Sequence, residues 1–229
     1  FVDDSDFLDF KADYGTATVW GHAAVQGFRV GIVTNNGPLD PAGANKATHF
    51  IQACCQAGLP ILFLQNTTGY IVGKASEEAG MIKHGSKMIQ AVSNANVPQI
   101  TLMCGASFGA GNYGMCGRAY NPRFLFSWPN TQTAVMGAEQ AALTMAIVME
   151  AGMKRKGQDV DHHQIDAMKS KVVENFERQQ SALVTSALLL DDGIIDPRDT
   201  RNVLGYTLSI CKDADARSLR PIQFGVARP

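Results

Sequence analysis

A glycine-rich heptapeptide, "FGAGNYG" at residues 108–114, has the residue types and spacing that most directly suggest chemistry. Its glycines follow the pattern G-x-G-x-x-G, with which dinucleotide-binding folds seat a pyrophosphate. In those folds the first glycine ends a strand, and an acidic residue about 20 residues later binds the ribose. Here we expect "GAS" to separate the strand from the loop, and no Asp or Glu occurs between Ala91 and Ala138. The sequence therefore argues against a dinucleotide site.

The same loop could instead bind an anion through its main chain. Glycine and alanine between a buried strand and a helix let the backbone approach a ligand closely, and the first amides of a helix lack internal acceptors. Such amides stabilise negative charge, for example on an enolate oxygen. The alternative is that the glycines allow tight packing of the helix on the strand. The residue types alone leave both interpretations open.

A second glycine loop, "QNTTGYIVG" at residues 65–73, has the same placement. It follows an apolar run that reads as a buried strand, and it precedes a helix with Glu77 and Glu78 in its first turn. Parallel strands that end in such loops place them at the carboxyl edge of a sheet, where open α/β folds bind ligands. We expect one site to be built from both loops.

The elements that must position these loops alternate between strand and helix patterns. Apolar stretches with turn and cap residues predict a hairpin around Gly27, a helix from Asp40–Pro41 to Gly58 and two buried strands. The predicted ranges are a hairpin over 16–36, strands over 60–66, 97–105, 123–129 and 133–137, and helices over 41–57, 76–95, 139–157 and 165–190. This order predicts an α/β fold with one continuous core and a helical C-terminal third.

Composition narrows the possible partners and the compartment. The 20 basic and 21 acidic residues give a net charge of -1, which disfavours nucleic acid and anionic membrane surfaces as partners. Five cysteines with no C-x-x-C pair suit buried thiols in a reducing compartment. No apolar run approaches the roughly 18 residues that cross a bilayer, so we expect a soluble, intracellular protein. The chain begins without methionine and is expected to be a fragment of a longer protein.

Five long segments, in order, carry a resemblance to a known family. They read "LQNTTGYIVG", "EEAGMIKHGSKMIQAVSNANVPQITL", "GASFGAGNYGMCGRAYNPRFLFSWPN", "AVMGAEQAA" and "DDGIIDPRDTRNVLG". They closely resemble the carboxyltransferase (β) subunits of biotin-dependent acyl-CoA carboxylases, nearest to the 3-methylcrotonyl-CoA and geranyl-CoA group. The resemblance covers nearly the whole chain and matches the C-terminal half of such subunits. It implies a crotonase-like ββα superhelix and a single carboxyltransferase C-terminal domain over residues 1–229, without the N-terminal half.

The resemblance also implies how the glycine loop works. In this family carboxybiotin is thought to leave a biotin enolate that takes a proton from acyl-CoA, and a pair of backbone amides in each half stabilises one enolate. The biotin-side pair matches Ala110 and Gly111, with Gly109 as the alternative. The residue just past the pair, Tyr113 or Asn112, is implied to shape the acyl pocket, and its uncharged character suits an apolar branched chain.

The first glycine loop is the other part of the implied substrate site. Gly69 belongs to this loop, and Tyr70 could line the approach of biotin. The alternative for Tyr70 is a loop aromatic that packs on the core.

Partners and cofactors follow from the same resemblance. They are carboxybiotin carried on an alpha subunit, acyl-CoA as substrate, the N-terminal carboxyltransferase half, and a homo-oligomer with a hexamer-type core. The implied location is the cytoplasm in bacteria or the mitochondrial matrix in eukaryotes. The isolated domain is expected to be inactive.

Four other functions remain as alternatives. An acyl-CoA decarboxylase would share the domain, but the match of "NYGMCGRAYNPRF" argues against it. A propionyl- or acetyl-CoA carboxylase subunit would differ in the acyl chain. A crotonase-type hydratase needs a placed pair of glutamates, and neither glycine loop contains one. In isolation the chain could be a non-catalytic module that binds the biotin carrier.

The remaining candidate residues favour ordinary structural roles. His162 and His163 are adjacent and lack metalloprotease spacing, so a solvated helix start is favoured and no metal site is predicted. Cys104 and Cys116 flank the glycine loop without a nearby histidine, which favours packed thiols. His84 could face the site, but the resemblance assigns proton removal to biotin.

Overall fold

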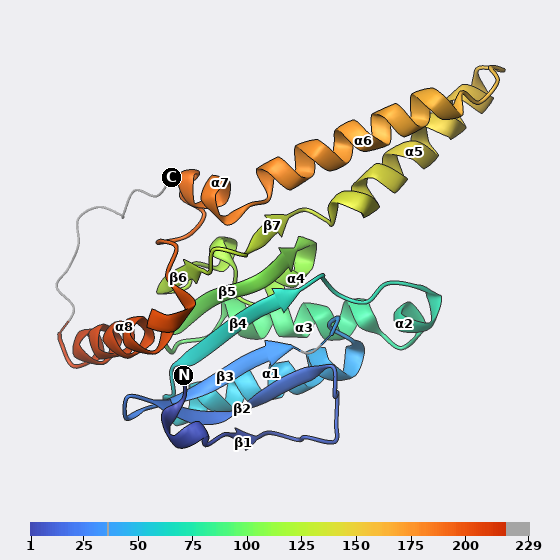
Figure 1. Cartoon of the computed structure of the whole chain (residues 1–229). Coiled ribbons are helices and arrows are strands. Elements are labelled where there is room, and N and C mark those ends of the chain that lie inside the picture. The colour runs from blue at the N-terminus through green and yellow to red at the C-terminus, as the bar shows by residue number, and fades with distance from the viewer. Residues whose placement is uncertain (36, 219–229) are drawn as a thin grey trace.

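The computed structural model describes residues 1–35 and 37–218, so the end of the predicted domain 1–229 lies outside the described residues. The strands are β1 Leu8–Asp9, β2 Thr18–Val25, β3 Phe28–Asn35, β4 Ile61–Thr67, β5 Gln99–Phe108, β6 Phe124–Ser127 and β7 Gln132–Ala134. The α-helices are α1 Pro41–Ala57, α2 Lys74–Glu78, α3 Met81–Ser93, α4 Gly109–Gly114, α5 Ala138–Arg155, α6 His162–Gln179, α7 Ala182–Ala187 and α8 Thr200–Asp215. Figure 1 shows this alternation of strands and helices, which confirms the predicted α/β class.

The short strand β1 forms one edge of the sheet, followed by the predicted hairpin and then by parallel strands. Strands β2 and β3 pair antiparallel from Thr18↔Asn35 to Val25↔Phe28. Gln26 and Gly27 between them have positive φ values of 50° and 80°, the backbone of a tight hairpin turn. Strands β3, β4, β5 and β6 then pair in parallel in chain order, and β7 adds to the far end of β5. The carboxyl ends of β4 and β5 consequently lie side by side.

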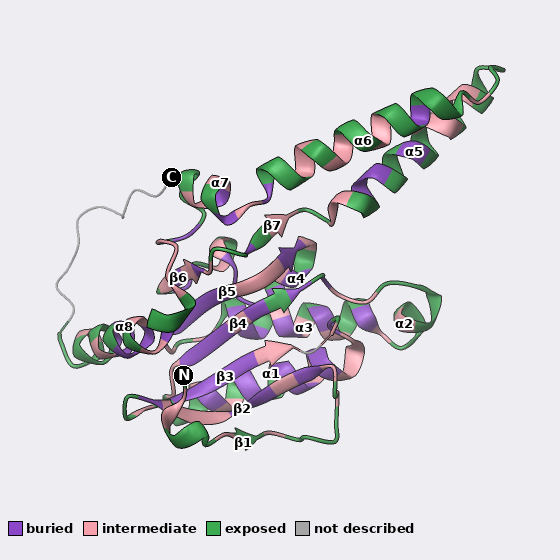
Figure 2. Ribbon diagram, viewed as in Figure 1, coloured by how far each residue is buried: buried purple, intermediate pink, exposed green. Residues whose placement is uncertain are grey.

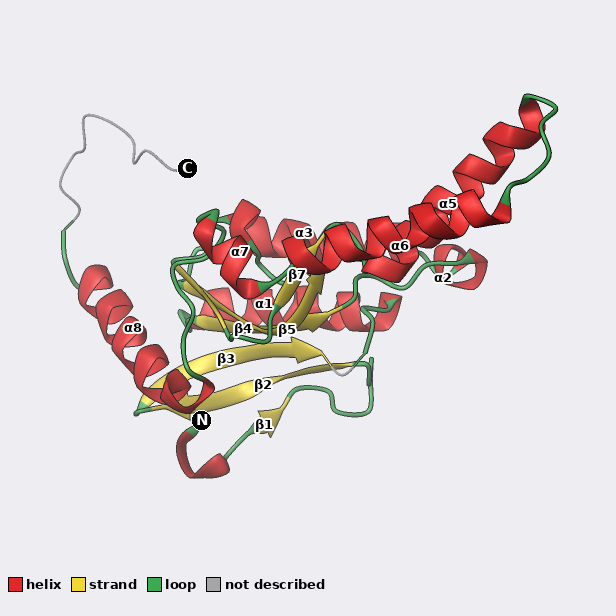
Figure 3. Ribbon diagram, turned by 45° about the horizontal axis from the view of Figure 1, so that its top comes forward, coloured by secondary structure: helices red, strands yellow, loops and turns green. Residues whose placement is uncertain are grey.

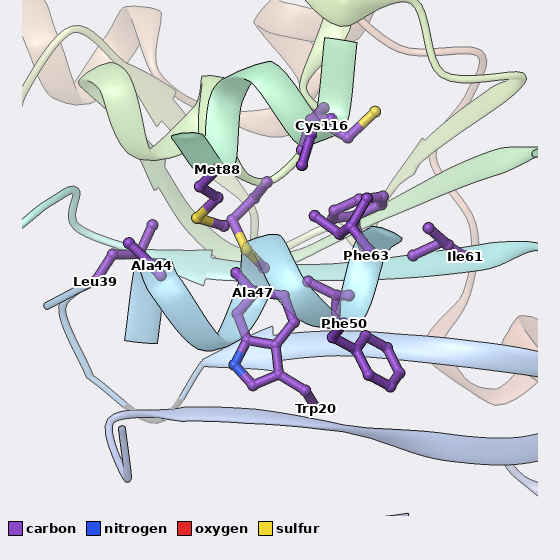
Figure 4. Packing of buried hydrophobic residues seen from close by; sticks show 14 of the residues in the cluster. Trp20, Leu39, Ala44, Ala47, Phe50, Ile61, Phe63, Met88 and Cys116 are labelled. Carbon is purple, nitrogen blue, oxygen red and sulfur yellow. The ribbon is translucent and has the colours of Figure 1, made fainter. Parts of the chain in front are cut away.

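Helices cover both faces of this sheet, as Figure 3 shows. Helices α1 and α3 cover one face, where Trp20, Phe50 and Met88 pack in the cluster of Figure 4. Helix α8 covers the other face through Leu204 and Leu208. Adjacent residues on β4 point to opposite faces, and the side chains facing each way are buried, which explains its continuous apolar run.

Helix α1 begins and ends where the sequence predicts. Asp40 is its N-cap, since Oδ1 accepts a 2.6 Å hydrogen bond from the amide of Gly43, and Pro41 occupies the first turn. Gly58 closes the helix with a left-handed φ of 64°. The helix is therefore fixed at both ends against the sheet.

Loss of the N-cap should cost measurable stability. We expect Asp40→Ala to lower the free energy of unfolding by about 1 kcal/mol, because it leaves an amide of the first turn without an acceptor. Asp40→Asn keeps a side-chain oxygen and is expected to cost only a fraction of this. Urea unfolding of the two variants checks the prediction, and equal losses in both would contradict it.

Two of the predicted helices are interrupted in the structure, and one helix was missed. The helix predicted over 76–95 is two helices, because Gly80 between α2 and α3 has a left-handed φ of 87°. The helix predicted over 165–190 is interrupted after α6. There the carbonyl of Gln180 accepts a hydrogen bond from Thr133 of β7, and Ser181 is extended. Helix α8 was not predicted at all, although its Leu204 and Leu208 close one face of the core.

The start of the glycine loop also differs from the prediction. Strand β5 runs through "GAS" to Phe108, so Gly109 directly follows the strand and "GAS" does not separate them. This removes one of the two arguments against a dinucleotide site. The other argument, the lack of an acidic residue between Ala91 and Ala138, still holds.

Helices α5 and α6 form a hairpin that extends away from the sheet in Figure 1. Ala142 and Ala146 of α5 are buried, whereas Leu143, Ile147 and Val148 of the same helix are exposed. Figure 2 shows buried and exposed stretches along α5. Neither these helices nor any other in the described ranges is long and apolar enough to cross a membrane.

Candidate functional site

The two glycine loops meet at the carboxyl edge of the sheet. Thr67 at the end of β4 lies opposite Ser107 at the end of β5. A Cβ added to Gly111 would lie only 2.8 Å from the Cα of Gly69 and 3.0 Å from Cγ2 of Thr67. Only glycine at position 111 permits this contact. The prediction that both loops come together is confirmed.

Short helix α4 carries the predicted main-chain donors. Gly109 has a φ of 54°, and a Cβ there would lie 2.8 Å from the carbonyl oxygen of Val135. The chain thus turns sharply from β5 into the helix. Ala110 is exposed and Gly111 is buried. First-turn amides have no intrahelical acceptor, and no acceptor elsewhere in the described chain bonds the amides of Ala110 and Gly111.

A buried polar network fixes α4 on the strands. Gln65 Oε1 accepts a 2.5 Å hydrogen bond from Ser107 Oγ, and Gln65 Nε2 donates to the carbonyl of Met115 at 2.6 Å. Asn112 Nδ2 donates to Ser107 Oγ at 2.8 Å. Gln65 and Ser107 are fully buried. These bonds hold the middle and the C-terminal end of α4 on β4 and β5, and therefore set the direction of the helix and its first amides.

Asn112 was predicted from the sequence as a site residue, whereas Gln65 and Ser107 were not. The available signal was a glutamine in the otherwise apolar run "PILFLQN", since a buried carboxamide requires partners.

A pocket of about 410 Å³ opens beside α4. Gly109, Asn112 and Tyr113 line it from the helix, and Leu125 and Val135 from β6 and the segment after β7. The structure thus brings together three of the predicted site residues. Gly69, Tyr70, Ala110 and Gly111 do not line this pocket.

Charge is nearly absent from the pocket. Arg118 is the one charged residue among those that line it, and its Nη1 lies 3.0 Å from Oδ1 of Asp192. Asp192 also accepts a hydrogen bond from the amide of Leu125. The ion pair fixes the wall of the pocket and offsets the charge of Arg118, so the lining suits an uncharged group.

Tyr70 packs beneath α4. Its hydroxyl lies 3.5 Å from Sδ of Met88 and so close to Gly114 that a Cβ there would collide with it. Burial raises the pKa of Tyr70 above its usual range. This contact matches the core-packing alternative for Tyr70, and its hydroxyl supports the helix from below.

The remaining candidates occupy structural positions. Asp161 caps helix α6 by accepting a hydrogen bond from Gln164, so His162 and His163 lie in an exposed first turn as expected. His84 is half-buried beside Gly80 and does not line the pocket. Within residues 1–35 and 37–218 no cluster of three potential metal ligands occurs.

The thiols beside the loop should be unreactive. Burial raises the pKa of Cys104 and of Cys116 to about 12. At pH 8 only about one thiol in ten thousand is then a thiolate, the form that attacks alkylating reagents. We expect iodoacetamide at pH 8 to leave both unmodified in the native protein and to modify both in denaturant, as peptide mass spectrometry would report. Equal labelling rates in the two states would contradict this.

Comparison with known proteins places this geometry in a family. The model of the carboxyl transferase domain matches residues 1–222. The chain belongs to the carboxyl transferase domain family. It is 50% identical over 228 residues to a probable biotin-dependent acyl-coenzyme A carboxylase beta2 subunit of Mycobacterium tuberculosis, covering 99% of this chain and 43% of the relative. It is 48% identical to a probable mitochondrial methylcrotonoyl-CoA carboxylase beta chain of Drosophila melanogaster, covering 99% and 39%.

Solved structures of carboxyl transferases show the same fold. The beta subunit of the geranyl-CoA carboxylase of P. aeruginosa superimposes with a TM-score of 0.91 at 50% identity, over 99% of this chain and 43% of that one. The hexameric transcarboxylase 12S core gives 0.82 at 32% identity, over 100% and 43%. The predicted crotonase-like fold is confirmed. The chain spans less than half the length of these relatives.

Proposed function

We propose that this chain is the C-terminal half of a carboxyltransferase subunit, which serves carboxybiotin and helps to transfer its carboxyl group to a branched, unsaturated acyl-CoA of the 3-methylcrotonyl or geranyl type. One observation carries the proposal: the amides of Ala110 and Gly111 lack acceptors in the described chain and stand at the meeting point of two glycine loops. Relatives with 48% and 50% sequence identity are named as a methylcrotonoyl-CoA carboxylase and a geranyl-CoA carboxylase.

The role of the chain is to stabilise negative charge. Bound carboxybiotin would supply the activated carboxyl group. The amides of Ala110 and Gly111 would donate hydrogen bonds to an oxygen that becomes negative during transfer. Ala110 is exposed, so a ligand can reach its amide, and no carboxylate lines the adjoining pocket to oppose an anion. The residues present therefore fit the group.

The pocket beside α4 would hold part of the acyl chain. Asn112 and Tyr113 give it an uncharged wall, and the Arg118–Asp192 pair leaves no free cation to attract a second carboxylate. An apolar branched chain fits this lining better than a dicarboxylic one.

Partners complete the proposed enzyme. The relatives are more than twice as long as this chain. We therefore propose that an N-terminal half of the subunit binds acyl-CoA, that an alpha subunit carries the biotin, and that the subunits assemble into a hexamer-type oligomer. The proposed location is the bacterial cytoplasm or the mitochondrial matrix, and two relatives are named as mitochondrial methylcrotonoyl-CoA carboxylase beta chains.

A substrate panel tests the proposal. The full-length subunit, combined with its biotin-carrying partner, would be assayed for bicarbonate-dependent ATP turnover on acetyl-, propionyl-, 3-methylcrotonyl- and geranyl-CoA. We expect kcat/KM on one branched, unsaturated thioester to exceed that on propionyl-CoA by about tenfold or more. Turnover confined to propionyl- or acetyl-CoA would contradict the acyl chain proposed here.

A further inference from the structure

A second concave surface lies between α1 and α3 and shares no lining residue with the pocket beside α4. It is a groove of about 1020 Å³. Lys11, Lys46, His49 and Lys87 line it, together with Tyr14 and five Asn or Gln side chains. None of its thirteen lining residues is acidic, although acidic residues outnumber basic ones in the whole chain. The groove is therefore a local concentration of positive charge.

Lys46 is the most unusual of these residues because it is only 1% exposed. Its Nζ donates one hydrogen bond of 3.3 Å, to the carbonyl of Thr18. Burial lowers the pKa of Lys46, and the charge of Asp9 opposes this in part. An ammonium group has three donors, so most of the hydrogen-bonding capacity of Lys46, which is one of the lining residues, is unused. A buried charge in this state is costly.

The other lysines of the groove also form no ion pair. Nζ of Lys11 lies 3.0 Å from Nδ1 of His49, and an ammonium group can only donate in this contact. Seven ion pairs occur in the described chain, and none includes Lys11, Lys46 or Lys87. Three lysines thus line one groove, and none of them forms an ion pair in the described chain.

We propose that this groove binds a ligand with a diphosphate group, of the nucleotide type. Three ammonium groups match the charge of two phosphates. Tyr14, 44% exposed, and the carboxamides of residues such as Gln52 and Gln90 supply a stacking surface and hydrogen bonds for a base and a ribose. A nucleoside diphosphate and coenzyme A both carry this group. The site is separate from the proposed carboxyltransferase site, and its test needs neither biotin nor an acyl group.

Equilibrium dialysis with labelled ADP and with inorganic pyrophosphate tests the site. The full-length protein would be used at an ionic strength of about 0.1 M, where charges act over roughly 10 Å. We expect saturable binding with a Kd of about 1 mM or tighter, weakened about tenfold by Lys87→Gln or Lys11→Gln. Lys83→Gln is the matched control, since this exposed lysine of α3 does not line the groove.

The variant Lys46→Met tests the site through thermal stability as well as through affinity. An apolar side chain of similar length removes the buried charge, so the variant should bind neither probe and should unfold at a temperature no lower than the wild type. If coenzyme A displaces ADP, the natural ligand of the groove is coenzyme A. If coenzyme A does not displace ADP, the natural ligand is a nucleotide. Absence of saturable binding at millimolar probe, or equal weakening by Lys83→Gln and Lys87→Gln, would overturn the proposal.

Discussion

Replacement of Gly111 by proline is expected to lower kcat/KM for carboxyl transfer by about 100-fold or more. Proline removes the amide hydrogen that we assign to the anion hole, and loss of one such donor costs about 3 kcal/mol of transition-state stabilisation. The ring also requires space where even a Cβ would approach the Cα of Gly69 to 2.8 Å. Transfer assays with the full-length subunit and its biotin-carrying partner would measure the loss.

A proline variant at Ala110 distinguishes the effect of a lost amide hydrogen from the effect of disturbed packing at Gly111. Its side chain is exposed, and proline is tolerated in the first turn of a helix because the lost hydrogen has no internal acceptor there. Ala110→Pro should therefore reduce activity by a similar factor with little loss of stability. Ala110→Gly keeps the amide and should retain activity. Wild-type activity in both proline variants would show that the anion hole lies elsewhere.

Gln65→Leu should give the largest loss of stability. The substitution leaves the hydroxyl of Ser107 and the carbonyl of Met115 without their buried partner. Each unsatisfied group costs about 1–3 kcal/mol, so we expect the free energy of unfolding to fall by about 3 kcal/mol. Helix α4 would also lose its fixed direction, and a displacement of about 1 Å can reduce activity up to about 100-fold. Urea unfolding and transfer assays would measure the two effects.

Gln99 is the matched control for Gln65. It is also a buried glutamine on a central strand, but its Nε2 bonds the carbonyl of Val92, away from α4. Gln99→Leu should lower stability by about 1 kcal/mol and leave kcat/KM unchanged. If Gln65→Leu and Gln99→Leu reduced activity equally, the network would have no specific role in positioning α4.

The sequence allowed prediction of elements that local signals define. Asp40, Pro41 and Gly58 bound α1 correctly because cap residues act within one turn. The turn at Gln26 and Gly27 likewise depends on backbone preferences of two residues. The apolar runs of β4 and β5 indicated strands buried on both faces, and the order of parallel strands then brought the two glycine loops together.

Features that depend on distant partners could not be predicted in this way. The break after α6 exists because Gln180 bonds β7, which is about 50 residues away in the sequence. The extension of β5 through "GAS" follows from its pairing with β4 and β7. Gln65 and Asn112 meet across 47 residues, so their spacing carries no local signal. The cationic groove between α1 and α3 arises in the same way.

Parallel measurement of acyl-CoA binding and carboxyl transfer by Gly111→Pro in the full-length subunit tests the central claim most directly. If this half serves carboxybiotin, titration calorimetry should give an acyl-CoA Kd within about twofold of wild type, while transfer falls about 100-fold. Unchanged transfer, or a loss fully explained by weaker binding of acyl-CoA, would contradict the claim that the amides of α4 act on the biotin side.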